Sequence, residues 1–143
     1  MADTTLQAIV LRVSSVLASS PFRFTRAQTP FGFELQPTGL IDQTFTVQGD
    51  AGQAIGGFRY TETRIDRVRI GVARSLQDDA TATLDRLTTD ATSIVAAVAR
   101  DGAARGGDYD LADQGRVIVI EHDRRAEFAV LRMTLPIDYE AQL

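Results

Sequence analysis

Residues 127–143, with the sequence EFAVLRMTLPIDYEAQL, form the stretch that decides the fold. Every second position holds an apolar or aromatic residue: Ala129, Leu131, Met133, Leu135, Ile137 and Tyr139. This period of two predicts a strand with one buried face, so the end of the chain is expected to be tied into a sheet. Pro136 has no N–H to donate, and it therefore predicts an edge strand or a place where pairing ends.

Two helices are predicted from apolar residues that recur three and four positions apart. The first covers residues 4–18, where Thr4 and Gln7 fit a capping box. The second covers residues 76–100 and is expected to stop at Arg100 and Gly102. Its apolar stripe consists of Leu84, Leu87, Ala91, Ile94, Val95 and Val98.

Further strands are predicted in the middle of the chain. A brief strand near residues 45–47 ends at Gly49, and the glycine-rich residues 48–57 are interpreted as a flexible connection. Residues 58–74 then form a long strand or strand pair, with a bulge near residues 64–66 because the apolar phase slips there.

The last part of the chain predicts a hairpin. Residues 117–121 pair with residues 127–137, and residues 122–125 (HDRR) form the turn. Adjacent strands with helices at separate positions indicate the α+β class. We therefore expect a single domain over residues 1–143, with a mainly antiparallel sheet and two helices packed on one face.

The composition excludes several kinds of chemistry. The chain contains no cysteine, and all 15 of its basic residues are arginine. Thiolate nucleophiles, disulfides, lysine Schiff bases and phosphate-loop lysines are therefore impossible. No apolar run is long enough for a membrane span, and a cytoplasmic product is expected.

Three groups of residues are candidates for a site. His122 is the only histidine, but no nucleophile motif accompanies it, so we expect no catalytic role. Asp108, Asp110 and Asp113 resemble a calcium loop, but their spacing departs from the EF-hand pattern, which favours a solvated loop over residues 101–115. No cofactor or metal site is predicted.

Arg67 and Arg69 alternate along the long strand and should project from the same face. The two guanidinium groups must then face solvent, acidic groups or a partner protein. Arginine is enriched at protein interfaces. Residues 1–75 carry 8 arginines against 6 acidic residues, and residues 76–143 carry 7 against 13, giving net charges of +2 and −6. One interpretation of this uneven charge is that the second half simply contains Asp-rich surface loops. The functional one is head-to-tail docking of copies, with Arg67 and Arg69 opposed to Asp108, Asp110 and Asp113.

The chain also resembles the tail terminator (tail completion) proteins of long-tailed bacteriophages and gene transfer particles. The resemblance covers nearly the full length. It depends on the strand RVRIGVAR (67–74), the helix around ATLDRLTTDATSIVAAV (82–98) and the final hairpin RVIVIEHDRRAEFAVLRMTLPIDYE (116–140). This is a similarity of pattern, without an invariant motif.

The resemblance implies a structural protein without enzymatic activity or cofactor. It implies a homohexameric ring that caps the tail tube, ends tail polymerisation and joins the tail to the head. Its partners would be further copies of itself, the major tail tube protein and a head–tail connector or stopper protein, with no nucleic-acid sequence recognition and no membrane. Its place would be the host cytoplasm during assembly and then the neck of a phage or phage-like particle. The alternatives are another neck component, such as a stopper, or a small anion-binding α+β domain or enzyme that uses Arg67 and Arg69.

Overall fold

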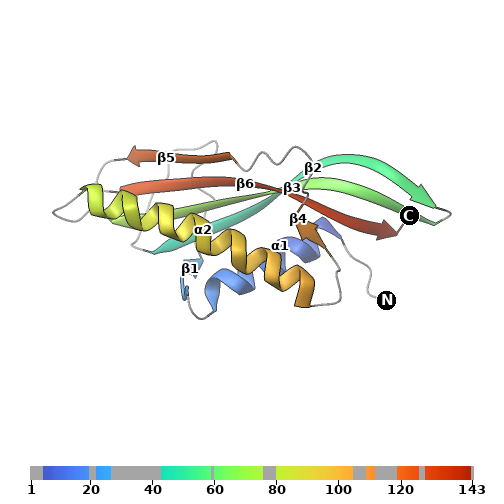
Figure 1. The fold of residues 1–143 in the computed structure, drawn as a ribbon, viewed down its shortest axis with the longest axis horizontal. Helices are drawn as coiled ribbons and strands as arrows, with labels where there is room; N and C mark the ends of the chain where they lie inside the picture. Colours follow the sequence, from blue (N-terminus) through green and yellow to red (C-terminus); the bar gives the residue numbers. More distant parts are fainter. Residues whose placement is uncertain are drawn as a thin grey trace.

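The computed structural model describes residues 5–19, 22–26, 43–58, 60–75, 80–104, 109–111, 119–125 and 128–142. Its elements are two helices and six strands (Figure 1), which confirms the α+β class. In chain order they are α1 (Leu6–Ala18), β1 (Thr25–Arg26), β2 (Thr44–Phe58), β3 (Thr61–Ser75), α2 (Ala80–Ala104), β4 (Asp110–Leu111), β5 (Val119–Arg125) and β6 (Phe128–Gln142).

The six strands form one sheet, in which β1, β2, β3, β6 and β4 follow one another and β5 also pairs with β6. Only the two-residue contact of β1 with β2 is parallel, so the sheet is mainly antiparallel, as predicted. β3 and β6 pair over all 15 of their residues without a register break. The C-terminal stretch is therefore a strand, and it lies inside the sheet.

Among the described residues, Pro136 lies at an interruption of pairing on one side of β6. Toward β3 it is in register with Arg67. On the opposite side, β5 pairs as far as Thr134 and β4 resumes at Ile137. Pro136 falls between these two segments, which agrees with its missing N–H and with the prediction that it marks a place where pairing ends.

The core lies between the helices and one face of the long strands. Register pairs such as Phe45 with Val72 and Leu131 with Val72 place the apolar positions of β2, β3 and β6 on the same face. In Figure 1, α1 and α2 lie together on one side of these strands. The strand members of the core cluster all belong to this face: Phe45, Val47, Val68, Ile70, Val72, Ala129, Leu131, Met133, Leu135, Ile137 and Tyr139.

Two arginines, one buried (Arg74) and one partly buried (Arg12), connect the helices to their surroundings. Arg74 of β3 donates two hydrogen bonds to Asp90 of α2, at 2.6 and 3.0 Å, and its guanidinium lies over the ring of Phe24. Arg12 of α1 contacts Asp101 of α2 at 3.4 Å and lies over the ring of Tyr109. Buried charges are tolerated when they are paired in this way.

The glycine-rich residues 48–57 were predicted as a flexible connection, and this prediction is wrong. They belong to β2, which continues to Phe58. A Cβ on Gly52 would lie 1.9 Å from the carbonyl oxygen of Ile65, and one on Gly49 would lie 2.8 Å from a side-chain atom of Leu6. Glycine is therefore required here because a neighbouring backbone and a helix approach closely.

The predicted bulge is on the neighbouring strand. The register of β3 with β6 is continuous, whereas that of β2 with β3 shifts between Asp50 and Gln53 and again between Ala54 and Gly56. The apolar phase of β3 changes near Asp66 because the side chain there is polar and bonded, as described below.

The helix boundaries also differ from the prediction. α1 is capped by Thr5, whose hydroxyl accepts a hydrogen bond from the Ala8 N–H, and Thr4 lies outside the described residues. α2 does not stop at Gly102 but continues to Ala104, and residues 76–79 of its predicted start lie outside the described residues. Leu84 is exposed, unlike the remainder of the predicted stripe, in which Val95 is partly buried and the others are buried.

The final hairpin forms as predicted, but with a shifted turn. Residues 122–125 are in β5, where His122 is in register with Leu131 and Arg125 with Phe128. The predicted turn at residues 122–125 is therefore wrong, and residues 126–127 lie outside the described residues. Among the described residues, no helix is long and apolar enough to cross a membrane.

Gly102→Ala tests the close contact between α2 and Tyr109. In an exposed helix this change would stabilise by about 1 kcal/mol. Here the new Cβ would lie 2.2 Å from the Tyr109 carbonyl oxygen, so we expect a lower free energy of unfolding, measured by urea denaturation. Ala99→Gly, at an exposed position of α2, reports the helix-propensity effect alone. A stabilised Gly102→Ala variant would contradict the contact.

Candidate functional site

The three long strands continue beyond the helices as an arm (Figure 1). We define the arm as residues 51–58 of β2, 61–66 of β3 and 137–142 of β6, which are held together by the β2–β3 and β3–β6 ladders. Residues 51–57 are all exposed. The arm is thus exposed along its β2 segment, while Asp66, Ile137 and Tyr139 at its base are buried.

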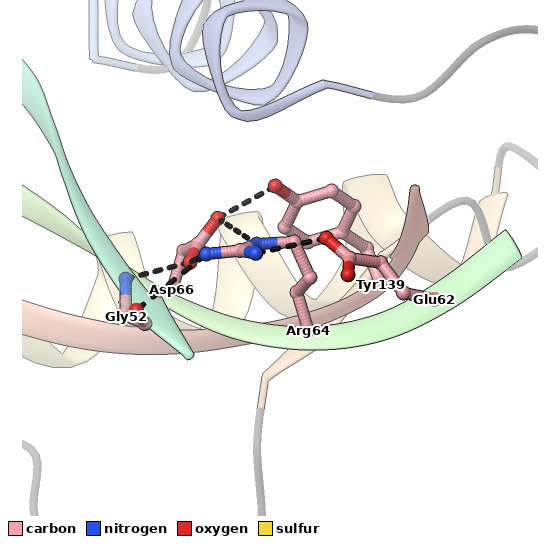
Figure 2. Close-up of polar contacts among 5 residues, drawn as sticks. All are labelled: Gly52, Glu62, Arg64, Asp66 and Tyr139. Atoms are coloured by element: carbon pink, nitrogen blue, oxygen red, sulfur yellow. Dashed lines mark hydrogen bonds and ion pairs between the residues drawn. The ribbon is translucent and has the colours of Figure 1, made fainter. Parts of the chain in front are cut away.

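Asp66 is the centre of a polar cluster and is only 1 % exposed. Its carboxylate accepts hydrogen bonds from the Tyr139 hydroxyl at 2.6 Å and from the Gly52 N–H at 2.7 Å. Arg64 donates to it through Nη2 at 3.3 Å and donates through Nη1 to Glu62 at 2.9 Å. Figure 2 shows how these residues bring β2, β3 and β6 together at one point.

The local fold explains why these groups meet. Asp66 and Arg64 continue the phase of β3 that carries Val68 and Ile70, so they point to the same face as the core. Tyr139 is in register with Arg64 on that face. The register shift in β2 then brings the Gly52 N–H to the carboxylate. A side chain at Gly52 would collide with the Ile65 carbonyl.

The electrostatics of the cluster keep its charges fixed near neutral pH. Burial alone would raise the pKa of Asp66, but hydrogen bonds from Tyr139, Gly52 and Arg64 outweigh it, and the pKa is lowered. Burial, followed by the hydrogen bond to Asp66, raises the pKa of Tyr139 to about 12. Hydrogen bonds to Glu62 and then Asp66 raise the pKa of Arg64. A carboxylate with these donors is a poor general base. The cluster instead holds β2, β3 and β6 together.

Of the predicted interface residues, Arg67 and Arg69 occupy alternate positions of β3, on the face opposite Asp66. Arg69 Nη2 lies 3.1 Å from an Asp50 carboxylate oxygen, so its charge is partly neutralised. Arg67 is exposed and forms no ion pair with a described residue. The accessible positive charge of this strand is therefore that of Arg67.

Of the three aspartates of the predicted loop, only Asp110 lies within the described residues. Asp108 and Asp113 lie outside the described residues. Asp110 is in β4, in register with Asp138 of β6. The predicted loop over residues 101–115 is therefore wrong in two places, because residues 101–104 belong to α2 and residues 110–111 form β4. The sheet order separates Asp110 from Arg67 by β6. In the described part of the chain, no group of three His, Asp or Glu residues could hold a metal ion.

Sequence reasoning did not identify the pair of Asp66 and Tyr139, which are 73 positions apart. One indication was present, because Asp66 occupies the phase of β3 that is otherwise buried and apolar. A carboxylate at such a position requires donors, and only the pairing of β3 with β6 shows which residue supplies one.

No protein-family model matches the sequence, and no curated protein shows significant similarity to it.

Asp66→Asn should reduce the free energy of unfolding at pH 7 by about 1–3 kcal/mol, because charge-assisted hydrogen bonds are lost. A lowered pKa in the folded state means that the ionised carboxylate stabilises above its ordinary pKa of 3.8 and that this stability is lost as the pH falls further. The difference from the unmodified protein should thus shrink below about pH 4 in urea titrations. The control is Asp85→Asn on the exposed face of α2. A difference that is independent of pH would contradict the role of the charge.

Tyr139→Phe tests the other half of the pair at alkaline pH. A raised pKa means that the protonated hydroxyl stabilises the fold below the ordinary value of 10.0 and that this stability is lost as the pH rises toward 12. The variant should lose about 1 kcal/mol at neutral pH, and the difference should narrow above about pH 10. Tyr60→Phe is the matched control, since Tyr60 is 80 % exposed. Equal alkaline profiles for Tyr139→Phe and the unmodified protein would contradict this coupling.

Proposed function

We propose that this protein is a structural assembly protein that forms a ring, caps a tail tube, ends its polymerisation and joins the tail to a head connector. The observation that carries the proposal is the arm, a three-stranded sheet that projects beyond the helices and exposes residues 51–57. A projecting sheet of this kind offers contact area to neighbouring subunits. The similarity of the strand, helix and hairpin pattern to tail terminator proteins supports the same role.

The chemistry of the chain also favours assembly over catalysis. Cysteine and lysine are absent from the sequence. The buried carboxylate Asp66 is occupied by three hydrogen-bonding partners, and an acid held in this way is not available to move protons. The polar groups at the base of the arm therefore hold strands in position.

A two-arginine anion site is less well supported. Such a site would use the guanidinium groups of Arg67 and Arg69 together, but Arg69 already binds Asp50. Arg67 alone is better suited to an electrostatic contact between proteins, where an exposed charge speeds association and fixes register more than it adds affinity.

In this proposal the subunits assemble in the host cytoplasm and remain at the neck of the particle. The ring contains six copies, and its partners are the major tail tube protein and a connector or stopper. Weak contacts between free subunits are sufficient, because binding to a preformed tube makes each contact between neighbours effectively intramolecular.

Deleting the gene should give particles with tails of irregular length or tails without heads, as seen by electron microscopy. Normal tails joined to heads after deletion would refute the terminator function.

Arg67→Glu tests the electrostatic part of this function. Because Arg67 is exposed, the variant should fold with an unfolding free energy within about 0.5 kcal/mol of the original. Particles assembled with it should nevertheless show uncapped or unattached tails. Arg100→Glu makes the same change of charge at an exposed position of α2 and should assemble normally. Equal assembly of both variants would exclude Arg67 from the interface.

A further inference from the structure

The arm has two strand edges with unoccupied pairing capacity among the described residues. β1 pairs with β2 only at Thr44 and Phe45, so the described partner of β2 beyond these residues is β3. β4 pairs with β6 only at Ile137 and Asp138, so from Tyr139 onward the described partner of β6 is β3. Gly52 is an exception on the β2 edge, because its N–H donates to Asp66 and its carbonyl accepts from Arg64. The other edge positions offer backbone donors and acceptors, to which another strand can add.

The β2 edge lacks the chemical protection that usually prevents such addition. Residues 51–57, with the sequence AGQAIGG, include no charged residue and no proline. Ile55 is 51 % exposed within this segment. Soluble proteins commonly guard exposed edges with charges, proline or bulges. Of these features, the β2 edge has only its two register shifts. Bulges twist and curve a sheet. Strand addition at a curved edge therefore favours a closed assembly of subunits over a flat, open-ended one.

We propose that the β2 edge of the arm pairs with the β6 edge, Tyr139 to Gln142, of a second copy of this chain. The strand directions allow this in a ring. β2 and β6 are both antiparallel to β3, so both run outward along the arm. When rotation about a ring axis keeps all arms pointing the same way, β2 of one subunit lies beside β6 of the next as a parallel pair.

The charges near the β6 edge favour pairing of β6 with β2 over pairing of two β6 edges. Asp138 and Glu140 lie near the β6 edge, so two β6 edges placed together would bring like charges opposite one another. The uncharged residues 51–57 offer no such repulsion. The preferred contact is therefore between two different edges, and contacts of this kind generate rings when the rotation closes. The inference deepens the proposed function, since it rests on self-association into a ring.

The absence of cysteine makes a direct test possible in the full-length chain. Gln53→Cys and Glu140→Cys place thiols at exposed positions of the two edges, on the face away from the core. Within one chain these positions lie on either side of β3 and two residues apart along it, so they are separated by more than about 9–10 Å, which is beyond disulfide reach. The variants are oxidised at high protein concentration, singly, as a mixture of the two and as a double variant, and the products are separated on non-reducing gels.

Heterologous pairing predicts monomers from each single variant, dimers from the mixture and a ladder of multimers from the double variant. Ser15→Cys with Thr92→Cys, at exposed positions of the two helices, should give only background. Efficient dimers from Gln53→Cys alone would indicate twofold β2 pairing and overturn the inference. Products no more abundant than in the helix control would also overturn it. Because the purified chain is used, failure here is distinguishable from failure of tail capping in particles.

Discussion

Fifteen residue pairs join β3 to β6, and both the core and the arm are built along this ladder. At one end, its apolar face receives the two helices and the core closes over it. At the other end, the same two strands continue with β2 as the arm. Since one register governs both regions, a slip of a single residue would move the core side chains to the opposite face and separate Tyr139 from Asp66. The position of the arm is thus fixed by the packing of the core.

The ladder changes character at Asp66. The same face of β3 carries Val72, Ile70 and Val68 beneath the helices and then Asp66 and Arg64 toward the arm. A buried carboxylate without donors would be strongly destabilising, and the three donors supplied by Tyr139, Gly52 and Arg64 remove that cost. Because one donor comes from each strand of the arm, the bonds that satisfy Asp66 also hold the three strands in register.

Periodicity predicted the elements that depend on local pattern, such as β6, β3 and the buried stripe of α2. It failed where a residue's role depends on a distant neighbour. Gly52 and Gly102 suggested a connection and a helix stop, whereas each is required by an approaching backbone carbonyl, from Ile65 and Tyr109. The ion pair of Arg69 with Asp50 and the bond between Tyr139 and Asp66 likewise depend on strand pairing, which composition and spacing do not determine.

For the proposed ring, the geometry favours backbone pairing over charge as the source of self-recognition. The functional interpretation of the sequence was a basic face opposed to acidic loops, but Arg69 is already paired and Asp110 is in a strand. Arg67 remains as an exposed charge that can steer an encounter. Backbone pairing at a strand edge instead supplies directional hydrogen bonds and fixes the angle between subunits. In the proposed ring, steering and directional pairing are complementary, since the first would govern how often subunits meet and the second whether successive contacts close.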